Sequence, residues 1–448
     1  MSVGEGVRID WCVAPGGALR GSLDVPGDKS ISHRALMIAA IAEGESRISG
    51  FLEAADTHAT AAILGALGVR IEAPAAGVRR VWGAGPGGLR APDAALDCGN
   101  SGTAMRLLAG LLAGQGVACV LTGDASLRRR PMQRVIDPLR AMGARIAAAP
   151  GGLPPLRLEH VARLRGIACD LPVASAQVKS AILLAGLGAT GETLVREPQP
   201  TRDYTERLLR AFGWTVDCGP GWARIAGGGV LHGRAVRVPG DFSAAAFFLV
   251  AATITPGSDL LLRGVALDPR RTGLLRALRA MGADIAEEAP GEADGLPVAD
   301  LRVRHAPLEG VDVPPAWVAD MIDEFPVLFV AAAAARGSTR VRGAAELRVK
   351  ESDRLATMAT ALRRLGIEVE ETADGATVTG GPLRGGRVAS AGDHRCAMAL
   401  AVAGLVADAP VEITDCAHVG TSFPGFAALA RGCGFDLRES RAGSRGKD

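Results

Sequence analysis

The sequence predicts an α/β protein of two domains, built from six copies of one repeating unit. At 448 residues the chain is too long for one ordinary hydrophobic core, so two domains are expected. With 48% hydrophobic and 22% charged residues, the composition is that of a folded globular protein. Two patterns that recur together along the chain indicate the repeat.

The first pattern is a helix end, a glycine, and a stretch in which apolar and polar residues alternate. A glycine after a helix can adopt the left-handed conformation that ends it, and the alternation suits a half-buried strand. A turn-rich segment at 289–295 lengthens one interval, and we expect it to form a surface loop. The glycines lie 68 to 84 residues apart, at Gly68, Gly143, Gly213, Gly282, Gly366 and Gly434.

The second pattern is a turn containing Gly, Asp, Asn or Ser that opens an apolar helix. The helices at 244–252 and 397–407 are apolar on nearly all sides, which is typical of buried helices. The two patterns together predict that each unit contains a buried helix, a strand, an amphipathic helix and a strand. We expect the six units to form two sets of three. The turns lie at 27–30, 99–102, 173–177, 240–243, 321–324 and 392–395.

The composition also excludes several classes of partner. The net charge is only +2 and aromatic residues make up 4%, so neither a nucleic-acid-binding field nor a base-stacking surface is expected. The eight cysteines contain no CxxC pair, so we expect neither a disulfide framework nor a metal site. The N-terminus lacks a secretory pattern and the apolar runs are short, which predicts a cytoplasmic protein without a membrane partner.

The segment 26–34 predicts an anion site at a helix start. A Pro-Gly turn precedes Lys29, Ser30 and Arg34, and an apolar helical run follows. The N–H groups of a first helical turn and the positive end of the helix dipole attract anions. The alternative is a capped surface helix whose basic residues are only solvated.

Cations and polar donors recur at the other predicted helix starts, which strengthens the case for an anion-binding cleft. Arg130 precedes Pro131, a residue suited to the first helical position, and Thr201 is a candidate helix cap. The donors are Asn100, Gly102, Arg106, Arg128, Arg129, Arg130, Ser175, Gln177, Lys179 and Arg202.

Two acidic sites are candidates for acid–base chemistry. Asp323 and Glu324 lie between apolar residues, where carboxylates are costly to bury without partners. Glu351 belongs to a Lys-Glu-Ser-Asp-Arg run at 350–354, which is either a charged first turn of a helix or an acid held among cations.

The histidines offer weaker candidates. His33, His394 and His418 could be ligands or acid–base groups, but no carboxylate or cysteine stands at metal-ligand spacing. His58 and His160 are expected to be surface or packing residues.

Six segments, in order over nearly the whole chain, carry motifs that occur together in one enzyme family. The most specific are Asn-Ser-Gly-Thr-Ala-Met-Arg at 100–106 and Lys-Glu-Ser-Asp-Arg at 350–354. With them the sequence resembles the 5-enolpyruvylshikimate-3-phosphate synthase family of the shikimate pathway. The segments are 26–34, 99–106, 130–132, 174–180, 347–354 and 393–398.

The resemblance implies a fold that agrees with the six repeats. Each domain would hold three βαβαββ units with buried helices, an inside-out α/β barrel. Residues 1–26 and 240–448 would form one domain, and 27–239 the other, on the shikimate 3-phosphate side. Phosphoenolpyruvate would bind in the cleft between the domains of a monomer.

The resemblance also implies the reaction, a step of chorismate and aromatic amino acid biosynthesis. The 5-hydroxyl of shikimate 3-phosphate adds to phosphoenolpyruvate, and phosphate leaves from a tetrahedral intermediate, without a cofactor. Neutralising two phosphates and two carboxylates would explain the many cations. Asp323 is implied as the base for the hydroxyl and Glu351 as the proton donor to the methylene carbon, with Lys29 as a third catalytic group.

By motif position, the resemblance assigns binding residues to both substrates. For shikimate 3-phosphate they are Lys29, Ser30, Arg34, Ser175, Gln177, Arg202, Asp323 and Lys350. For phosphoenolpyruvate they are Lys29, Asn100, Gly102, Arg130, Gln177, Arg354 and Arg395.

Two positions bear on inhibitors and on departures from the family. Many members carry a lysine where this chain has Thr421, so a second ammonium near phosphoenolpyruvate is missing here or is replaced by a neighbouring cation. The family uses a small residue at the position of Gly102 to admit glyphosate, which implies that glyphosate inhibits this enzyme.

Two alternatives remain. The sister transferase acting on UDP-N-acetylglucosamine shares the fold, but it usually has Lys-Asn where this chain has Lys29 and Ser30. It also has a mobile-loop cysteine, whereas no cysteine lies between Cys119 and Cys169 here. A non-catalytic phosphate- or nucleic-acid-binding protein would need more net charge and would not explain Asp323.

Overall fold

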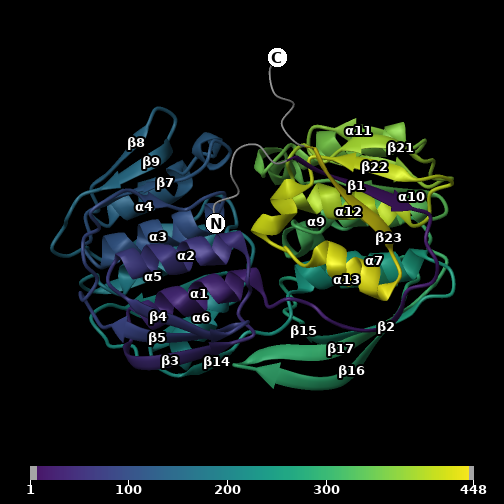
Figure 1. The fold of residues 1–448 in the computed structure, drawn as a ribbon. Coiled ribbons are helices and arrows are strands. Elements are labelled where there is room, and N and C mark those ends of the chain that lie inside the picture. The colour runs from purple at the N-terminus through teal and green to yellow at the C-terminus, as the bar shows by residue number, and fades with distance from the viewer. Residues whose placement is uncertain (1–7, 443–448) are drawn as a thin grey trace, which may run out of the picture. The chain divides into compact units, whose positions relative to one another are not determined.

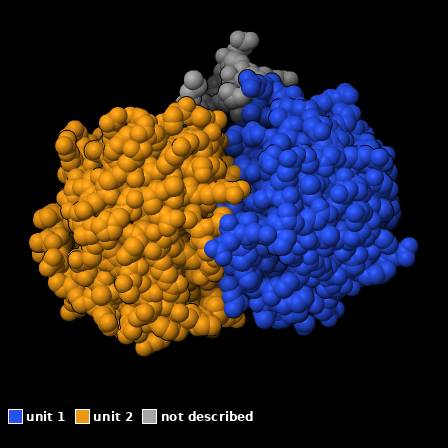
Figure 2. Space-filling view, turned by 90° about the horizontal axis from the view of Figure 1, so that it is seen from below, with its two compact units in different colours: residues 1–26, 239–292, 296–448 blue, residues 27–238, 293–295 orange. Residues whose placement is uncertain are grey.

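The structure is a computed structural model that describes residues 8–442 (Figure 1). It divides into two compact units (Figure 2). Within the described range, unit 1 holds the chain up to Pro26, Pro239–Glu292 and the chain from Leu296 onward, and unit 2 holds Gly27–Val238 and Ala293–Gly295. The chain therefore crosses between the units after Pro26 and after Val238.

Unit 2 contains three repeats, each a buried helix, a strand, an amphipathic helix and an antiparallel strand pair. The first is α1 (Lys29–Ala40), β3 (Glu43–Ser49), α2 (Ala55–Ala66), β4 (Arg70–Ala75) and β5 (Val78–Ala84). The second is β6 (Leu96–Asp97), α3 (Gly102–Gly114), β7 (Cys119–Thr122), η1 (Leu127–Arg129), α4 (Gln133–Ala141), β8 (Ile146–Ala149) and β9 (Leu153–Leu158). The third is β10 (Ala168–Asp170), α5 (Ala176–Gly186), β11 (Glu192–Arg196), α6 (Tyr204–Ala211), β12 (Val216–Gly219), β13 (Trp222–Ala226) and, after it, β14 (Ala235–Arg237).

Unit 1 contains the other three repeats and the first two strands, β1 (Arg8–Ala14) and β2 (Arg20–Asp24). The fourth repeat is α7 (Phe242–Ile254), β15 (Asp259–Ala266), α8 (Gly273–Ala280), β16 (Asp284–Ala293) and β17 (Leu296–Arg304). The fifth is α9 (Pro315–Val318), η2 (Ala319–Met321), α10 (Phe325–Ala334), β18 (Ser338–Val341), η3 (Ala345–Val349), α11 (Arg354–Arg364), β19 (Glu368–Thr372) and β20 (Gly375–Thr379). The sixth is β21 (Gly386–Ala389), α12 (His394–Gly404), β22 (Val411–Thr414), η4 (Ala417–Thr421), α13 (Phe426–Cys433) and β23 (Asp436–Ala442).

Five of the six repeats share one sheet plan, in which the strand after the buried helix pairs in parallel with a leading strand; the sheet of the fifth repeat has only the three strands β18-β20-β19. The second, third and sixth repeats supply their own leading strands, as in the order β6-β7-β9-β8. At the two crossings the leading strands are exchanged: β2 pairs with β15, and β14 pairs with β3. The N-terminal strand β1 completes the last sheet between β22 and β23.

The buried helices form the centre of each unit. In unit 2, α3 packs against α1 and α5, and in unit 1 the helices α7, α10 and α12 pack on one another. Every residue of α7 is buried, because the helix is apolar all round. The predicted two-domain α/β class with buried helices is confirmed.

The six repeat glycines behave as the first pattern predicts. All take a positive φ, between 87° and 127°. The surface loop predicted at 289–295 is wrong, because β16 extends to Ala293 and only Asp294 and Gly295 turn the chain. Both have positive φ, as a tight two-residue hairpin turn requires.

Candidate active site

The first group of candidate residues lies at the start of α1 in unit 2. The Asp28 carboxylate caps the helix and accepts a hydrogen bond from the Ile31 N–H at 2.8 Å. Lys29 follows, and its Nζ lies 3.1 Å from Asp56 Oδ2 in the first turn of α2. Asp56 was not predicted, because no local pattern links two residues that only the packing of α1 against α2 brings together.

Arg34 is buried, one helical turn beyond Ser30. Its guanidinium donates to Thr205 Oγ1 and Ser180 Oγ, each at 2.8 Å, and to the Ser30 carbonyl at 3.0 Å. Burial is the main cause that lowers the pKa of Arg34 to about 10, and the nearby charge of Arg202 is the second cause. The Arg34 guanidinium therefore ties α1 to α5 and α6.

The second group surrounds the start of α3, which Ser101 caps. Arg130 Nη2 donates to Asn100 Oδ1 at 2.7 Å, so two predicted residues contact each other directly. A Cβ on Gly102 would lie 2.8 Å from Arg106 Nη1 and 3.5 Å from Arg130 Nη1. Only glycine leaves the space in front of these guanidinium groups open.

Gln177 belongs to the same group through Arg106. Arg106 Nη1 donates to Gln177 Oε1 at 3.0 Å, and Gln177 Nε2 donates to Thr103 Oγ1 at 2.9 Å. The expectation that Pro131 opens the next helix is wrong, because α4 begins at Gln133 after Met132. Residues 128 and 129 instead lie in η1, and Arg130 follows directly as its C-cap. In this position the Arg130 side chain contacts Asn100.

The third group lies at the starts of α5 and α6. The helix predicted to open at the turn 173–177 is α5, which Ser175 caps, and Arg202 lies two residues before α6. Thr201 does not cap α6, because Asp203 holds the N-cap position and the Thr201 hydroxyl donates to Glu197. Lys179 is not a ligand donor, since its ammonium is buried in ion pairs with glutamates.

Arg354 organises the candidate residues of unit 1. Its fully buried guanidinium lies 2.8 Å from Asp393, 2.6 Å from Glu351 and 3.4 Å from Asp323. Burial alone would lower the pKa of Arg354, but the three carboxylates outweigh it and raise the pKa. Arg354 therefore stays charged and holds both candidate acid–base groups.

Asp323 and Glu351 differ from the neighbouring acid Glu324 in exposure. The side chains of Asp323 and Glu351 are 19% and 22% exposed, whereas that of Glu324 is 1% exposed. The first two are accessible to a substrate and the third is part of the interior. A carboxylate next to a fixed cation, with access to substrate, is suited to proton transfer.

Arg395 approaches the same aspartate from α12. Its Nη1 donates to the Asp323 carbonyl at 3.2 Å, and its Nη2 lies 3.9 Å from Asp323 Oδ2. Arg271, which the sequence did not single out, contacts Asp323 at 4.0 Å and Asp241 at 3.3 Å. A lone arginine in an Arg-rich chain gives no local signal, so only the fold identifies it.

Lys350 and Glu351 lie before a helix rather than in one. The sequence places 350–354 at a helix start, but α11 begins at Arg354 with Asp353 as its N-cap. Lys350 Nζ forms an ion pair with Glu346 at 3.1 Å. Thr421 ends η4, where its hydroxyl donates to the His418 carbonyl at 2.7 Å.

His33 is not an acid–base group. Burial, and then Lys29 and Arg34, hold its pKa well below the usual value of 6.5, so the ring is neutral. Its Nδ1 lies 2.8 Å from Thr60 Oγ1. Across residues 8–442, no three His, Cys, Asp or Glu side chains are grouped as a metal site requires.

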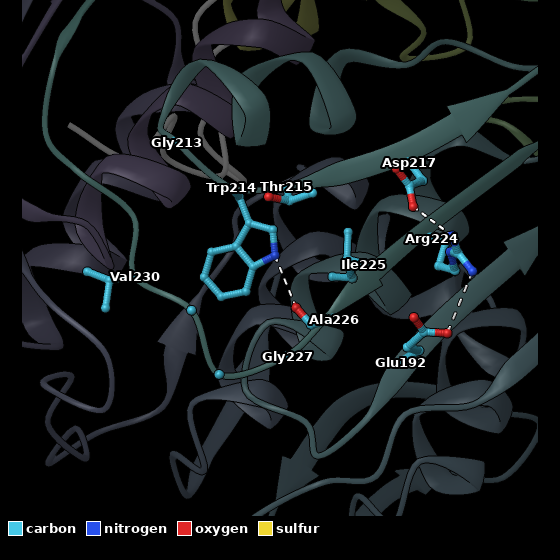
Figure 3. A pocket seen from close by; sticks show the side chains of 12 residues that line it. Glu192, Gly213, Trp214, Thr215, Asp217, Arg224, Ile225, Ala226, Gly227 and Val230 are labelled. Atoms are coloured by element: carbon cyan, nitrogen blue, oxygen red, sulfur yellow. Dashed lines mark hydrogen bonds and ion pairs between the residues drawn. The ribbon is translucent and has the colours of Figure 1, made fainter.

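A surface hollow of about 470 Å³ lies elsewhere, in the third repeat of unit 2 (Figure 3). Trp214 and the glycine run 227–229 line one part, and the ion pairs of Arg224 with Asp217 and Glu192 line another. None of the predicted substrate-binding residues lines it. No helix in the described part of the chain is long and apolar enough to cross a bilayer.

Two units of three α/β repeats, with cations and accessible carboxylates at their helix starts, define an enzyme for small anionic substrates. The EPSP synthase family (3-phosphoshikimate 1-carboxyvinyltransferase) matches residues 13–429. A 3-phosphoshikimate 1-carboxyvinyltransferase of Xanthomonas campestris pv. campestris (strain B100) is 62% identical over 427 residues, 95% of this chain and 98% of the relative. One of Xanthomonas oryzae pv. oryzae (strain PXO99A) is 60% identical over 433 residues, 97% of this chain and 98% of the relative.

Among solved structures, EPSP synthase from Acinetobacter baumannii superposes with a TM-score of 0.87 at 47% sequence identity. The match covers 97% of this chain and 100% of that chain. The chain therefore belongs to the EPSP synthase family. It is an enzyme of the 3-phosphoshikimate 1-carboxyvinyltransferase class, and the UDP-sugar alternative is not favoured.

Proposed function

We propose that the chain transfers the carboxyvinyl group of phosphoenolpyruvate to the 5-hydroxyl of shikimate 3-phosphate, with Asp323 and Glu351 as its acid–base pair. The observation that supports these roles most directly is that both carboxylates contact the buried Arg354, at 3.4 and 2.6 Å. They are held on one cation and remain accessible to substrate.

In the addition step, the 5-hydroxyl oxygen bonds to C2 of phosphoenolpyruvate while the methylene carbon takes up a proton. Asp323 accepts the hydroxyl proton and Glu351 donates the proton to carbon. In the elimination step, the new methyl group returns a proton to Glu351, the C–O bond to phosphate breaks, and the departing phosphate takes up the proton that Asp323 accepted. The product is an enol ether, and phosphate is released.

The binding roles follow the charges of the two substrates. We assign shikimate 3-phosphate to Lys29, Ser30, Arg34, Ser175, Gln177, Arg202, Asp323 and Lys350. We assign phosphoenolpyruvate to Lys29, Asn100, Gly102, Arg130, Gln177, Arg354 and Arg395. The contacts of Arg130 with Asn100, and of Arg354 with both acid–base candidates, support the second set.

Lys29 belongs to both sets, and Asp56 supports its position. The ion pair at 3.1 Å fixes the ammonium near the start of α1. A cation that stabilises charge developing in the transition state is most effective when its position is set beforehand. We propose that Lys29 stabilises the negative charge that develops as the hydroxyl adds.

The proposed residues are divided between the two units, so we propose that both units must contribute to one reaction site and that they close on the substrates. We further propose that the enzyme is a cytoplasmic monomer that glyphosate inhibits.

A phosphate-release assay with purified protein tests this function. We expect release only when shikimate 3-phosphate and phosphoenolpyruvate are both present. Release with UDP-N-acetylglucosamine and phosphoenolpyruvate, but not with the shikimate pair, would refute the proposal. Mass spectrometry of the product distinguishes carboxyvinyl transfer from simple hydrolysis of phosphoenolpyruvate.

A further inference from the structure

We propose that Glu197 is a positioning residue for shikimate 3-phosphate, acting through Ser175 and Thr201. This inference rests on the proposed function, in which Ser175 and Arg202 bind that substrate. Glu197 follows β11 directly, and nothing in the local sequence marks it as functional.

Glu197 joins two segments that regular secondary structure does not hold. Its Oε1 accepts a hydrogen bond from the Ser175 N–H at 3.2 Å, and the Thr201 hydroxyl donates to Oε1 at 2.6 Å. Ser175 is the N-cap of α5, and Thr201 immediately precedes Arg202. One carboxylate thus sets the relative position of the two segments that carry the proposed ligands.

The ammonium of Lys179 stabilises the buried carboxylate of Glu197. The Glu197 side chain is fully buried, and its Oε2 lies 2.9 Å from Lys179 Nζ. Burial alone would lower the pKa of Lys179, but the attraction of Glu206 and Glu197 raises it. A hydrogen bond to an ionised acceptor is shorter and stronger than one to a neutral acceptor. Ser175 and Thr201 are therefore held more firmly than a neutral side chain would hold them.

Glu206 provides a close comparison within the same cluster. It is 2% exposed and also lies 2.9 Å from Lys179 Nζ. Burial raises its pKa, and its Oε2 has no hydrogen-bond partner in the described structure. None of its hydrogen bonds or ion pairs reaches Ser175 or Thr201. Glu206 shares the burial and the cation of Glu197 but makes neither of its hydrogen bonds to Ser175 and Thr201. Among the proposed ligands, its negative charge acts on Arg34.

The test compares Glu197→Gln with Glu206→Gln and Glu192→Gln. Glu192 begins the same strand β11, and its side chain is exposed. We expect E197Q to raise the KM for shikimate 3-phosphate about tenfold, with kcat and the KM for phosphoenolpyruvate within about twofold of wild type. E206Q and E192Q should leave all three constants within about twofold of wild type.

Equal effects of E197Q and E206Q on the KM for shikimate 3-phosphate would show a merely structural role and overturn the proposal. An unchanged KM in E197Q would also overturn it. If E197Q does not fold, the triple variant K179M/E197Q/E206Q, which removes the buried ammonium together with both of its carboxylate partners, must show the same increase. A wild-type KM in the triple variant is a third result against the proposal.

The wild-type enzyme separates this inference from the function on which it depends. If wild type shows no turnover with shikimate 3-phosphate and phosphoenolpyruvate, the proposed function fails and the inference fails with it. If wild type turns over, and Ser175→Ala raises the KM for shikimate 3-phosphate while E197Q does not, only the inference fails.

Discussion

Asp323, Glu324 and Glu351 are carboxylates of similar intrinsic acidity. Their surroundings decide which of them can exchange a proton with a substrate. Glu324 is enclosed between Arg271 and Arg395, at 3.8 and 3.7 Å. Asp323 and Glu351 keep one side open while Arg354 holds the other. Only a carboxylate with an open side can exchange a proton with a substrate.

Replacing either accessible carboxylate should therefore remove catalysis and leave the fold intact. Asp323→Asn and Glu351→Gln should each lower kcat by at least ~10²-fold, the usual scale for a positioned acid or base. Steady-state kinetics measures this, and binding of shikimate 3-phosphate should persist. Glu370→Gln, on the exposed side of β19, is the control and should have no effect. Near-normal turnover in either variant would remove that residue from its role.

Gly102 lies next to the guanidinium groups of Arg106 and Arg130, and we propose Arg130 as a ligand of phosphoenolpyruvate. We expect glyphosate to inhibit wild type in competition with phosphoenolpyruvate. In Gly102→Ala the new Cβ would lie 2.8 Å from Arg106 Nη1, so the guanidinium that holds Gln177 must move. The variant should show a higher KM for phosphoenolpyruvate and weaker glyphosate inhibition, each by about tenfold or more.

Inhibition assays with both proteins test this expectation. Gly65→Ala is a suitable control, because a Cβ there meets nothing within 4 Å and the residue lies in the last turn of α2. Full turnover of wild type at glyphosate concentrations far above the KM for phosphoenolpyruvate would refute the expectation.

His33 should make the stability of the fold depend on pH. Its folded pKa is well below 6.5 because of burial, whereas in the unfolded chain it takes up a proton near pH 6.5. The unfolded state therefore binds more protons below pH 6.5, and the free energy of unfolding should fall by up to about 1.4 kcal/mol per pH unit there. Above pH 6.5 the ring is neutral in both states and contributes no pH dependence.

Urea unfolding between pH 5 and pH 8 measures this effect. In His33→Gln the slope below pH 6.5 should be smaller, whatever the absolute stability of the variant. The exposed His160, replaced by Gln, is the matched control and should keep the wild-type slope. Equal slopes in wild type and His33→Gln would contradict the assignment.

At the scale of elements, the starts of the buried helices recur in one form. In five of the six, the N-cap side chain accepts a hydrogen bond from the first turn, and these caps are Asp28, Ser101, Ser175, Asp241 and Asp393. The sixth, α10, has a proline in its first turn instead and no side-chain cap. Each start leaves other N–H groups available to an anion.

The helix ends recur as well, and their glycines can be tested. Gly143 has a φ of 100°, and a Cβ there would meet no atom within 4 Å. The cost of Gly143→Ala is therefore purely conformational, and we expect it to lower the free energy of unfolding by about 1–2 kcal/mol. Gly65→Ala, at a helical position with open space, should instead raise it by about 0.5–1 kcal/mol.

Denaturant titration of the two variants decides the point. The opposite signs make the comparison independent of any general effect of replacing glycine with alanine. If both substitutions stabilised the protein, the left-handed requirement at Gly143 would be disproved.

At the scale of the whole molecule, the proposed reaction needs residues from both units. The chain passes from unit 1 to unit 2 after Pro26 and back after Val238, and a leading strand lies beside each of these passages. We expect shikimate 3-phosphate together with phosphoenolpyruvate or glyphosate to reduce the radius of gyration measured by small-angle scattering. An unchanged scattering curve with both ligands bound would contradict closure, and the Asp323→Asn variant should still contract.

The sequence by itself determined the class of fold and the order of its repeats. Helix ends and buried helices can be recognised in the local sequence, because both depend on nearby residues. Examples are the glycines Gly143 and Gly213 and the all-apolar helix α7. Helix starts were less accurate. The run 350–354 predicts a first helical turn, but α11 begins only at Arg354 with Asp353 as its N-cap, since several polar residues in a row offer more than one possible start.

Only the tertiary structure decided which side chains meet. Asp56 reaches Lys29, Arg271 reaches Asp323, and Glu197 reaches Ser175 through the packing of elements that are distant along the chain. The exchange of the leading strands β2 and β14 between the first and fourth repeats is likewise invisible locally, because each strand pairs with a partner more than a hundred residues away. The motifs identify the chemistry, and the contacts that orient it depend on the three-dimensional arrangement of the repeats.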